Sequence, residues 1–284
     1  MRRFPAISSV IRRLKGSRTV MTCLLLLLLI AVVGIIGPLL TPHGYADTDF
    51  ATRFAAPTFN ELHLFGTDEL GRDQFARTLL GVKVTLFVAV IASVVSLGIG
   101  VLYGATAGLF GGKIDAVMMR AVDALYALPF VFFVILLMVV FDRNFLLIFV
   151  AIGAINWLDM ARIVRGQTMS LKNRAFVEAA RLTGVSTAGI IWRHITPNLI
   201  GVVIVYITLT IPQAILVESF LSFLGLGVQE PQTSLGALVN TGVAHMHRAP
   251  WLLIIPAGVL ALILFCFNFL GDGLRDIADP KYKV

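Results

Sequence analysis

The sequence predicts an all-α, polytopic membrane protein with six transmembrane helices. Of its 284 residues, 58% are hydrophobic and only 14% are charged, a balance typical of a chain whose solvent is mostly lipid. The apolar runs are about twenty residues long and do not alternate, whereas strands of a transmembrane barrel alternate over about ten residues. Because backbone groups in lipid must be hydrogen-bonded within the protein, we expect these runs to be helices.

Six apolar runs are each near or above the roughly 20 residues that cross a bilayer as a helix. They lie at about residues 20–40, 84–110, 117–141, 145–164, 199–222 and 251–270. The first run is too long for a signal-peptide core and is followed by no convincing cleavage site, so we expect an uncleaved signal anchor. We divide the chain into residues 1–83, with the basic N-terminus, first helix and an outer loop, and residues 84–284, with five helices.

Basic residues orient these spans. With the N-terminus inside, the inner segments hold seventeen of the 23 Lys and Arg residues, and the outer segments hold six. Both termini are therefore predicted to be cytoplasmic. This asymmetry also accounts for the net charge of +7 without a nucleic-acid partner. The bases before the first span are Arg2, Arg3, Arg12, Arg13, Lys15 and Arg18.

Two outer segments, residues 41–83 and 225–250, are long. The first carries six acids against four bases and is expected to have some ordered structure. The second is rich in turn-forming residues and is a candidate to re-enter the membrane where protein shields its backbone. It contains His245, Met246 and His247, but no third ligand with a recognisable spacing accompanies the two histidines, and we assign no metal.

Small residues recur every four positions in the second span and so form one ridge of a helix. Such a ridge lets another backbone approach closely, either within this subunit or between subunits. The residues are Ala92, Ser96, Gly100, Gly104, Gly108 and Gly112.

No enzymatic motif is present in the sequence. It has no G-x-x-x-x-G-K-[ST] loop for ATP, no H-E-x-x-H and no G-x-S-x-G, so we expect no enzyme, no ATPase site of its own and no cofactor. Glu218 lies in the fifth span, where an ionisable group is expensive, and Pro212 should kink that span. Both are candidates to line a pathway, although a structural hydrogen-bonded role for Glu218 is the alternative.

Charged residues at the inner ends of spans three and four are expected to anchor helices. The spacing of Arg120 and Asp123 allows a pair on one helix face, and Asp159 and Arg162 are interpreted in the same way.

The inner segment from Phe176 to Asn198 predicts two short helices. Gly184 can take the left-handed conformation that ends a helix, and Ser186 can cap the next helix, which should run to about Ile195 before Pro197 stops it. The first helix has little bulk and could insert into a groove of a cytosolic partner. The alternative is an amphipathic hairpin lying on the inner leaflet.

This segment resembles the coupling loop of binding-protein-dependent ABC importer permeases. The matching residues are Glu178, Ala179 and Ala180, followed by Gly184 and by His194 and Pro197. Other matches follow in order along nearly the whole chain, and together they resemble the C-type permease of oligopeptide, dipeptide and nickel importers, most closely the oligopeptide member. They are FGTDELGRD (65–73), GGKIDAVMMRAVD (111–123), NWLDMARIVRGQTMSL (156–171), SFLGLGVQEP (222–231) and GDGLRDIADPK (271–281). Leu235 departs from the pattern, because the family usually has Trp there.

The resemblance implies a bacterial inner-membrane protein with a first helix and a five-helix permease core, whose coupling loop lies at about residues 165–198. It implies pairing with a homologous B-type permease, two cytosolic ATPase subunits and an external solute-binding protein that delivers peptide. Glu178, Ala179, Ala180 and Gly184 would belong to the coupling element, and no peptide-contacting residue carries over. The implied function is half of an oligopeptide pathway; uptake of dipeptides, nickel or other small peptides, or a self-sufficient secondary transporter, are the alternatives.

Overall fold

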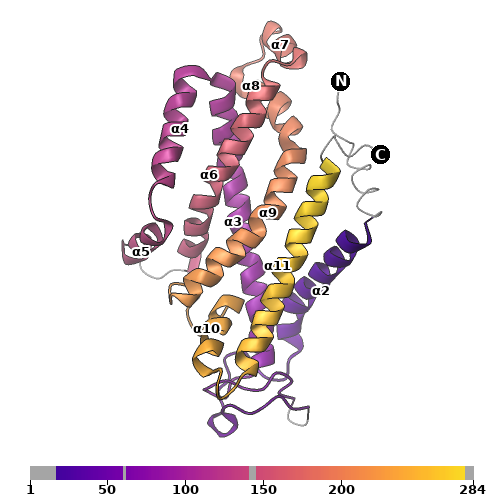
Figure 1. The fold of residues 1–284 in the computed structure, drawn as a ribbon, viewed down its shortest axis with the longest axis vertical. Helices are drawn as coiled ribbons and strands as arrows, with labels where there is room; N and C mark the ends of the chain where they lie inside the picture. The colour runs from indigo at the N-terminus through magenta and orange to yellow at the C-terminus, as the bar shows by residue number, and fades with distance from the viewer. Residues whose placement is uncertain (1–16, 60–61, 141–144, 279–284) are drawn as a thin grey trace.

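The computed structural model describes residues 17–59, 62–140 and 145–278, and these residues are predominantly helical (Figure 1). Among them there is no strand beyond the isolated bridge between Thr67 and Asp73, so the all-α prediction is confirmed. The bases at positions 2–15, and Lys281 of the last motif, lie outside the described residues. The helices are α2 (Arg18–Leu40), α3 (Gln74–Phe110), α4 (Gly112–Tyr126), α5 (Phe130–Val140), α6 (Phe145–Leu171), α7 (Ala175–Leu182), α8 (Thr187–Ile190), α9 (Thr196–Phe223), α10 (Leu235–His245) and α11 (Trp251–Ala278).

Four helical segments in the described part of the chain are long and apolar enough to cross a membrane: residues 18–40, 74–110, 187–223 and 251–276. They contain the first, second, fifth and sixth predicted spans, and the count of six stays a prediction. α3 begins ten residues earlier than predicted, because Asp73 accepts the Ala76 N–H at 2.7 Å and caps the helix. It therefore continues without a break across the boundary placed between residues 83 and 84.

The predicted third span, residues 117–141, is not one helix. α4 ends at Tyr126 and α5 begins at Phe130, with Pro129 between them. Proline lacks an N–H, and it disfavours helical backbone at the residue before it, so the chain turns at this point. α4 is amphipathic, whereas α5 consists of eleven apolar residues.

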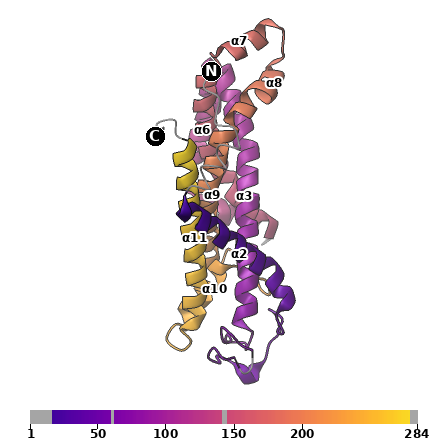
Figure 2. The same cartoon turned by 90° about the vertical axis from the view of Figure 1, so that its right-hand side faces the viewer.

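The long helices α3, α6, α9 and α11 run roughly parallel to the longest axis of the molecule, and α2 crosses them obliquely (Figures 1 and 2). α7 and α8 lie at one end, which we call the α7 end. α10 and the segment 41–73 lie at the other, the α10 end. That segment contains a short 3₁₀ turn at Phe50–Thr52, which confirms the expected order in the first outer loop.

The small-residue ridge of α3 packs against α6 within this chain. A Cβ added at Gly100 would lie 2.6 Å from Met160, and one at Gly108 would lie 2.7 Å from the carbonyl oxygen of Arg165. The backbone of α6 therefore approaches α3 too closely for larger side chains, which settles the ridge as an intrachain contact at these positions.

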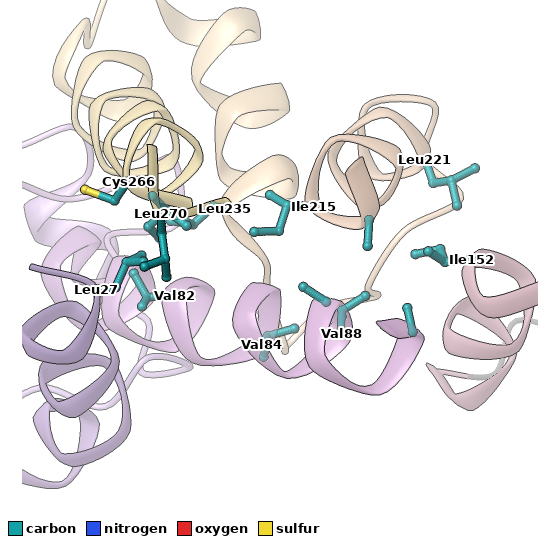
Figure 3. Packing of buried hydrophobic residues seen from close by; sticks show 14 of the residues in the cluster. Leu27, Val82, Val84, Val88, Ile152, Ile215, Leu221, Leu235, Cys266 and Leu270 are labelled. Atoms are coloured by element: carbon teal, nitrogen blue, oxygen red, sulfur yellow. The ribbon is translucent and has the colours of Figure 1, made fainter. Parts of the chain in front are cut away.

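Apolar side chains from α2, α3, α6, α9, α10 and α11 meet in one core (Figure 3). Leu27, Val82, Ile152, Ile215 and Leu270 are among its buried members. A second cluster nearer the α7 end joins α3, α6, α7 and the segment from α8 to α9. The first cluster holds the C-terminal half of α9, and the second holds its N-terminal half. The candidate site residues lie beside these two parts of α9.

Candidate functional site

The turn after α7 is built as the sequence predicts. Gly184 has φ +76°, the left-handed conformation, so this prediction is confirmed. The N–H of Val185 donates to the Ala180 carbonyl oxygen at 3.0 Å, and the N–H of Gly184 donates to that of Arg181 at 3.0 Å. This pair of bonds satisfies the last carbonyl groups of α7 and fixes the direction in which the chain leaves it.

α7 has one buried and one exposed face. Val177 and Ala180 are buried in the second cluster, whereas Glu178 and Ala179 are exposed, and Leu182 is 89% exposed. The fold thus brings Glu178, Ala179 and Gly184 to the exposed side of this loop and turns Ala180 inward. The three-residue spacing of Val177 and Ala180 is the sequence signal for this inner face.

The helical segment that begins at Thr187 does not stop at Pro197, so the prediction that it ends there was wrong. Ser186 caps α8 by accepting the Gly189 N–H at 3.2 Å, as predicted. The chain then continues through a π-helical turn at Ile191–Ile195 directly into α9. Pro197 is tolerated because it stands in the first turn of α9, where a backbone N–H is not required, and the Asn198 side chain donates to the His194 carbonyl oxygen at 2.6 Å. Residues 187–223 are therefore one continuous helical segment.

Glu218 lies in α9 near the α10 end and is fully buried, and Pro212, six residues before it, is also buried. The Ser222 hydroxyl donates to Glu218 Oε1 at 2.7 Å and lies 3.2 Å from the hydroxyl of Ser234, the residue that caps α10. Glu218 Oε2 has no hydrogen-bond partner among the described residues. Ser222, which binds this carboxyl group, thus connects α9 to the start of α10, and a role for Glu218 in lining a pathway stays a prediction.

Ion pairs join α4 to α6. Arg165 donates to both carboxylate oxygens of Asp115, at 2.5 and 2.6 Å, and Arg162 donates to Asp123 at 2.9 Å. Asp123 therefore pairs across helices, and the predicted pair with Arg120 on one helix was wrong. The hydrogen bonds from Arg165 hold the pKa of Asp115 below its usual range.

An ionic cluster around two buried arginines lies at the α10 end, and sequence reasoning did not single out its members as a site. Arg72 donates to Asp68 Oδ2 at 2.7 Å and to both oxygens of Glu230, at 2.8 and 2.9 Å. Arg77 donates to Glu230 Oε1 at 3.2 Å. The available signal was their place in two of the matched motifs: Asp68 and Arg72 in one, and Glu230 in the other.

The histidine near the end of α10 joins this region to the first outer segment. His245 Nε2 lies 2.9 Å from Glu69 Oε2, and its ring meets the edge of Phe54. The C-terminal end of α10 is thus bound to the segment 50–77 through His245. The connection before α10 is bound to the same segment through Glu230.

Comparison with known proteins places this arrangement in a family. Residues 100–284 match the family described as "Binding-protein-dependent transport system inner membrane component", and residues 7–57 match "N-terminal TM domain of oligopeptide transport permease C". The chain belongs to the family of inner-membrane components of binding-protein-dependent transport systems. The predicted resemblance is therefore confirmed, and the exposed loop at the α7 end is the region that carried it.

Similar proteins of known name agree with this assignment. The chain is 54% identical to the oligopeptide transport system permease protein OppC of Escherichia coli (strain K12), over 95% of this chain and 89% of that protein. It is 52% identical to OppC of Haemophilus influenzae (strain ATCC 51907 / DSM 11121 / KW20 / Rd), over 95% and 87%. The dipeptide transport system permease protein DppC of Bacillus subtilis (strain 168) is 45% identical, over 96% and 85%.

Proposed function

We propose that this chain forms half of the translocation pathway of an ATP-driven oligopeptide importer and transmits ATPase motion into that pathway. Its partners are a homologous permease subunit, two cytosolic ATPase subunits and an external binding protein that delivers peptide. Both termini and the α7 end are cytoplasmic, and the α10 end is outside. ATP is bound and hydrolysed by the ATPase subunits, because this chain carries no phosphate-binding loop.

The observation that carries this proposal is the continuous helical segment 187–223. It leads from the exposed α7–α8 loop to Glu218, which lies near the C-terminal end of α9. Helices change shape less readily than loops, so a displacement of α8 is passed along α9 to the α10 end. The π turn lets α8 continue into α9 in spite of Pro197. This rigid connection would have no purpose if the α7–α8 loop were only a solvent-exposed linker.

The docking surface is the exposed side of the loop, formed by Glu178, Ala179 and Gly184. Glu178 supplies one charge, and Ala179 supplies little bulk, so a groove in an ATPase subunit can close around α7. Ala180 supports the surface from behind through its contact with the second cluster. Pro212 and Glu218 lie on α9, and we propose that they line the pathway toward its C-terminal end.

The cargo is proposed from the relatives. The two OppC proteins above are named as oligopeptide permeases and share more residues with this chain than the dipeptide permease does. Dipeptide transport is the second candidate, because the 45% identity to DppC still extends over 96% of this chain.

Reconstitution in lipid vesicles tests the proposal. Vesicles containing this chain, its partner permease and both ATPases, with ATP inside and binding protein outside, should accumulate a labelled pentapeptide. Omitting any one subunit or ATP should abolish the uptake. Accumulation by this chain alone would show a self-sufficient transporter and contradict the proposal. Competition by unlabelled dipeptide, compared with unlabelled pentapeptide, decides between the two cargo classes.

A further inference from the structure

We propose that Arg72 and Arg77 form a carboxylate-binding site at the α10 end, in which Glu230 is an exchangeable occupant. The carboxylate of an external ligand would take its place during transport. The inference rests on the proposed function, because it requires that a ligand arrives at this end of the molecule from outside.

The two arginines hold Glu230 as a receptor would hold a ligand. Arg72 directs two parallel N–H bonds at the two carboxylate oxygens, at 2.8 and 2.9 Å, and Arg77 adds a third at 3.2 Å. This fork geometry is the strong, specific way in which arginine recognises a carboxylate. Arg72 is 3% exposed and Arg77 is 2% exposed, so neither guanidinium depends on bulk water for its hydrogen bonds.

The cluster contains one fixed and one replaceable carboxylate. Asp68 is buried, and it also accepts the backbone N–H groups of Leu70 and Arg72, each at 2.9 Å. The side chain of Glu230 is 57% exposed and stands on the connection between α9 and α10. Two guanidinium groups need two carboxylates to remain neutral, and Asp68 supplies only one of them. The second position must be filled, and the largely exposed side chain of Glu230 fills it.

Arg77 offers more donors than the described residues satisfy. Its Nε and Nη1 atoms are buried and make no hydrogen bond to the described residues, although Nε lies 3.6 Å from Asp68 Oδ2 and Nη2 binds Glu230. A buried, unsatisfied donor is costly, and a charged one more so. A ligand carboxylate that enters further than Glu230 would gain hydrogen bonds that Glu230 does not make, which supplies a reason for exchange.

Two external groups have the required chemistry: the C-terminal carboxylate of a peptide and an acidic side chain of the binding protein. The test uses trialanine as the free acid and as the C-terminal amide in the reconstituted complex. The ratio of the two KM values is compared between wild type and Glu230→Gln, so any preference of the binding protein itself cancels. Glu69→Gln is the matched control, because Glu69 lies in the same region but pairs with His245.

A neutral glutamine is a weaker occupant of the arginine pair, so an incoming carboxylate should displace it more easily. We expect Glu230→Gln to lower KM for the free acid by about threefold or more and to leave KM for the amide unchanged. Glu230→Asp, which keeps the charge but shortens the reach, should shift the ratio in the same direction by less. Glu69→Gln should leave the ratio at its wild-type value.

The outcomes separate the two sources. If the KM ratio is unchanged but the unloaded binding protein binds the Glu230→Gln complex more tightly, the carboxylate comes from that protein. If neither quantity changes, the site does not exchange and the inference is overturned. It is equally overturned if neither Glu230 variant assembles, because Glu230 would then be an immobile structural residue. Wild-type uptake of the free acid tests the proposed function separately.

Discussion

Buried charged residues in this protein meet partners from distant parts of the chain. Arg72 and Glu230 are separated by 158 residues, and Arg165 and Asp115 by 50. Such a pair contributes little when compared with apolar residues of the same volume, but removing one partner leaves a buried charge unpaired. These residues therefore specify which segments lie together more than they add to the free energy of folding.

The pH dependence of stability should report the bond to Glu230. The hydrogen bond from Arg72 lowers the pKa of Glu230 from its ordinary value of 4.5. The folded state thus binds the proton less readily than the unfolded state, so this stabilisation is present above about pH 4.5 and is lost as pH falls through the lower folded value. The unfolding midpoint of the purified protein, measured from pH 7 to pH 3, should fall less steeply for Glu230→Gln than for wild type. Parallel curves would contradict the assignment.

Local backbone features could be predicted from the sequence, but the ion-pair partners of charged side chains could not. Gly184 and Ser186 were predicted correctly because the turn after α7 is built from neighbours in the chain. The pair of Arg120 and Asp123 was wrong because helical spacing reports only what shares a helix face. Asp123 instead reaches Arg162, 39 residues away, and that contact depends on how α4 lies against α6.

The contact between α3 and α6 depends on small residues at the level of whole helices. The glycines of the ridge let the α6 backbone approach, and the second cluster packs beside them. Because helix association in lipid relies on close packing more than on a hydrophobic driving force, this contact should be sensitive to single added atoms.

Gly108→Ala should therefore destabilise the protein. Its Cβ would lie 2.7 Å from the Arg165 carbonyl oxygen and from Thr168 Cβ, and overpacking of this kind costs about 1–3 kcal/mol. Gly98→Ala on the same helix is the control, because its Cβ would meet nothing within 4 Å and alanine favours the helix. The unfolding midpoint in detergent measures both variants. Equal midpoints would show that the ridge is not a tight contact.

Two prolines show why element boundaries were only partly predictable. Pro129 separates α4 from α5, whereas Pro197 stands inside a continuous segment, although both follow helix-forming sequence. The difference lies in position relative to the helix start: Pro197 falls in a first turn that the preceding π turn creates. A π turn has no clear sequence signal, so the continuous helical segment from α8 to α9 could not be predicted.

The molecule as a whole has two polar ends joined by apolar helices. The α7 end carries the exposed α7–α8 loop, and the α10 end carries the ionic cluster and the ordered segment 41–73 (Figures 1 and 2). The resemblance to importer permeases was accessible from sequence because it rests on short stretches of sequence, and two of them, residues 65–73 and the α7–α8 loop, fall at these two ends. The contacts that join each end to the core could be identified only from the three-dimensional structure.

The two ends should be accessible from opposite sides of the membrane. Thr48 and Leu182 are exposed, and the native Cys23 and Cys266 are buried, so engineered thiols should be labelled over a low background. In intact right-side-out vesicles, an impermeant thiol reagent should label Thr48→Cys but not Leu182→Cys until the membrane is opened. The reverse pattern would invert the topology.

The central claim is that the α7 loop couples ATP hydrolysis to transport, and the number of peptides moved per ATP tests it most directly. Glu178→Lys reverses the exposed charge, and Gly184→Val places a β-branched residue at φ +76°, where a Cβ costs about 1–2 kcal/mol. Both variants should insert and bind peptide-loaded binding protein, but they should lose ATPase subunits or hydrolyse ATP with reduced uptake. Asp47→Lys, an exposed acid at the α10 end, should keep the wild-type ratio. Wild-type uptake per ATP and full ATPase retention in both loop variants would contradict the account.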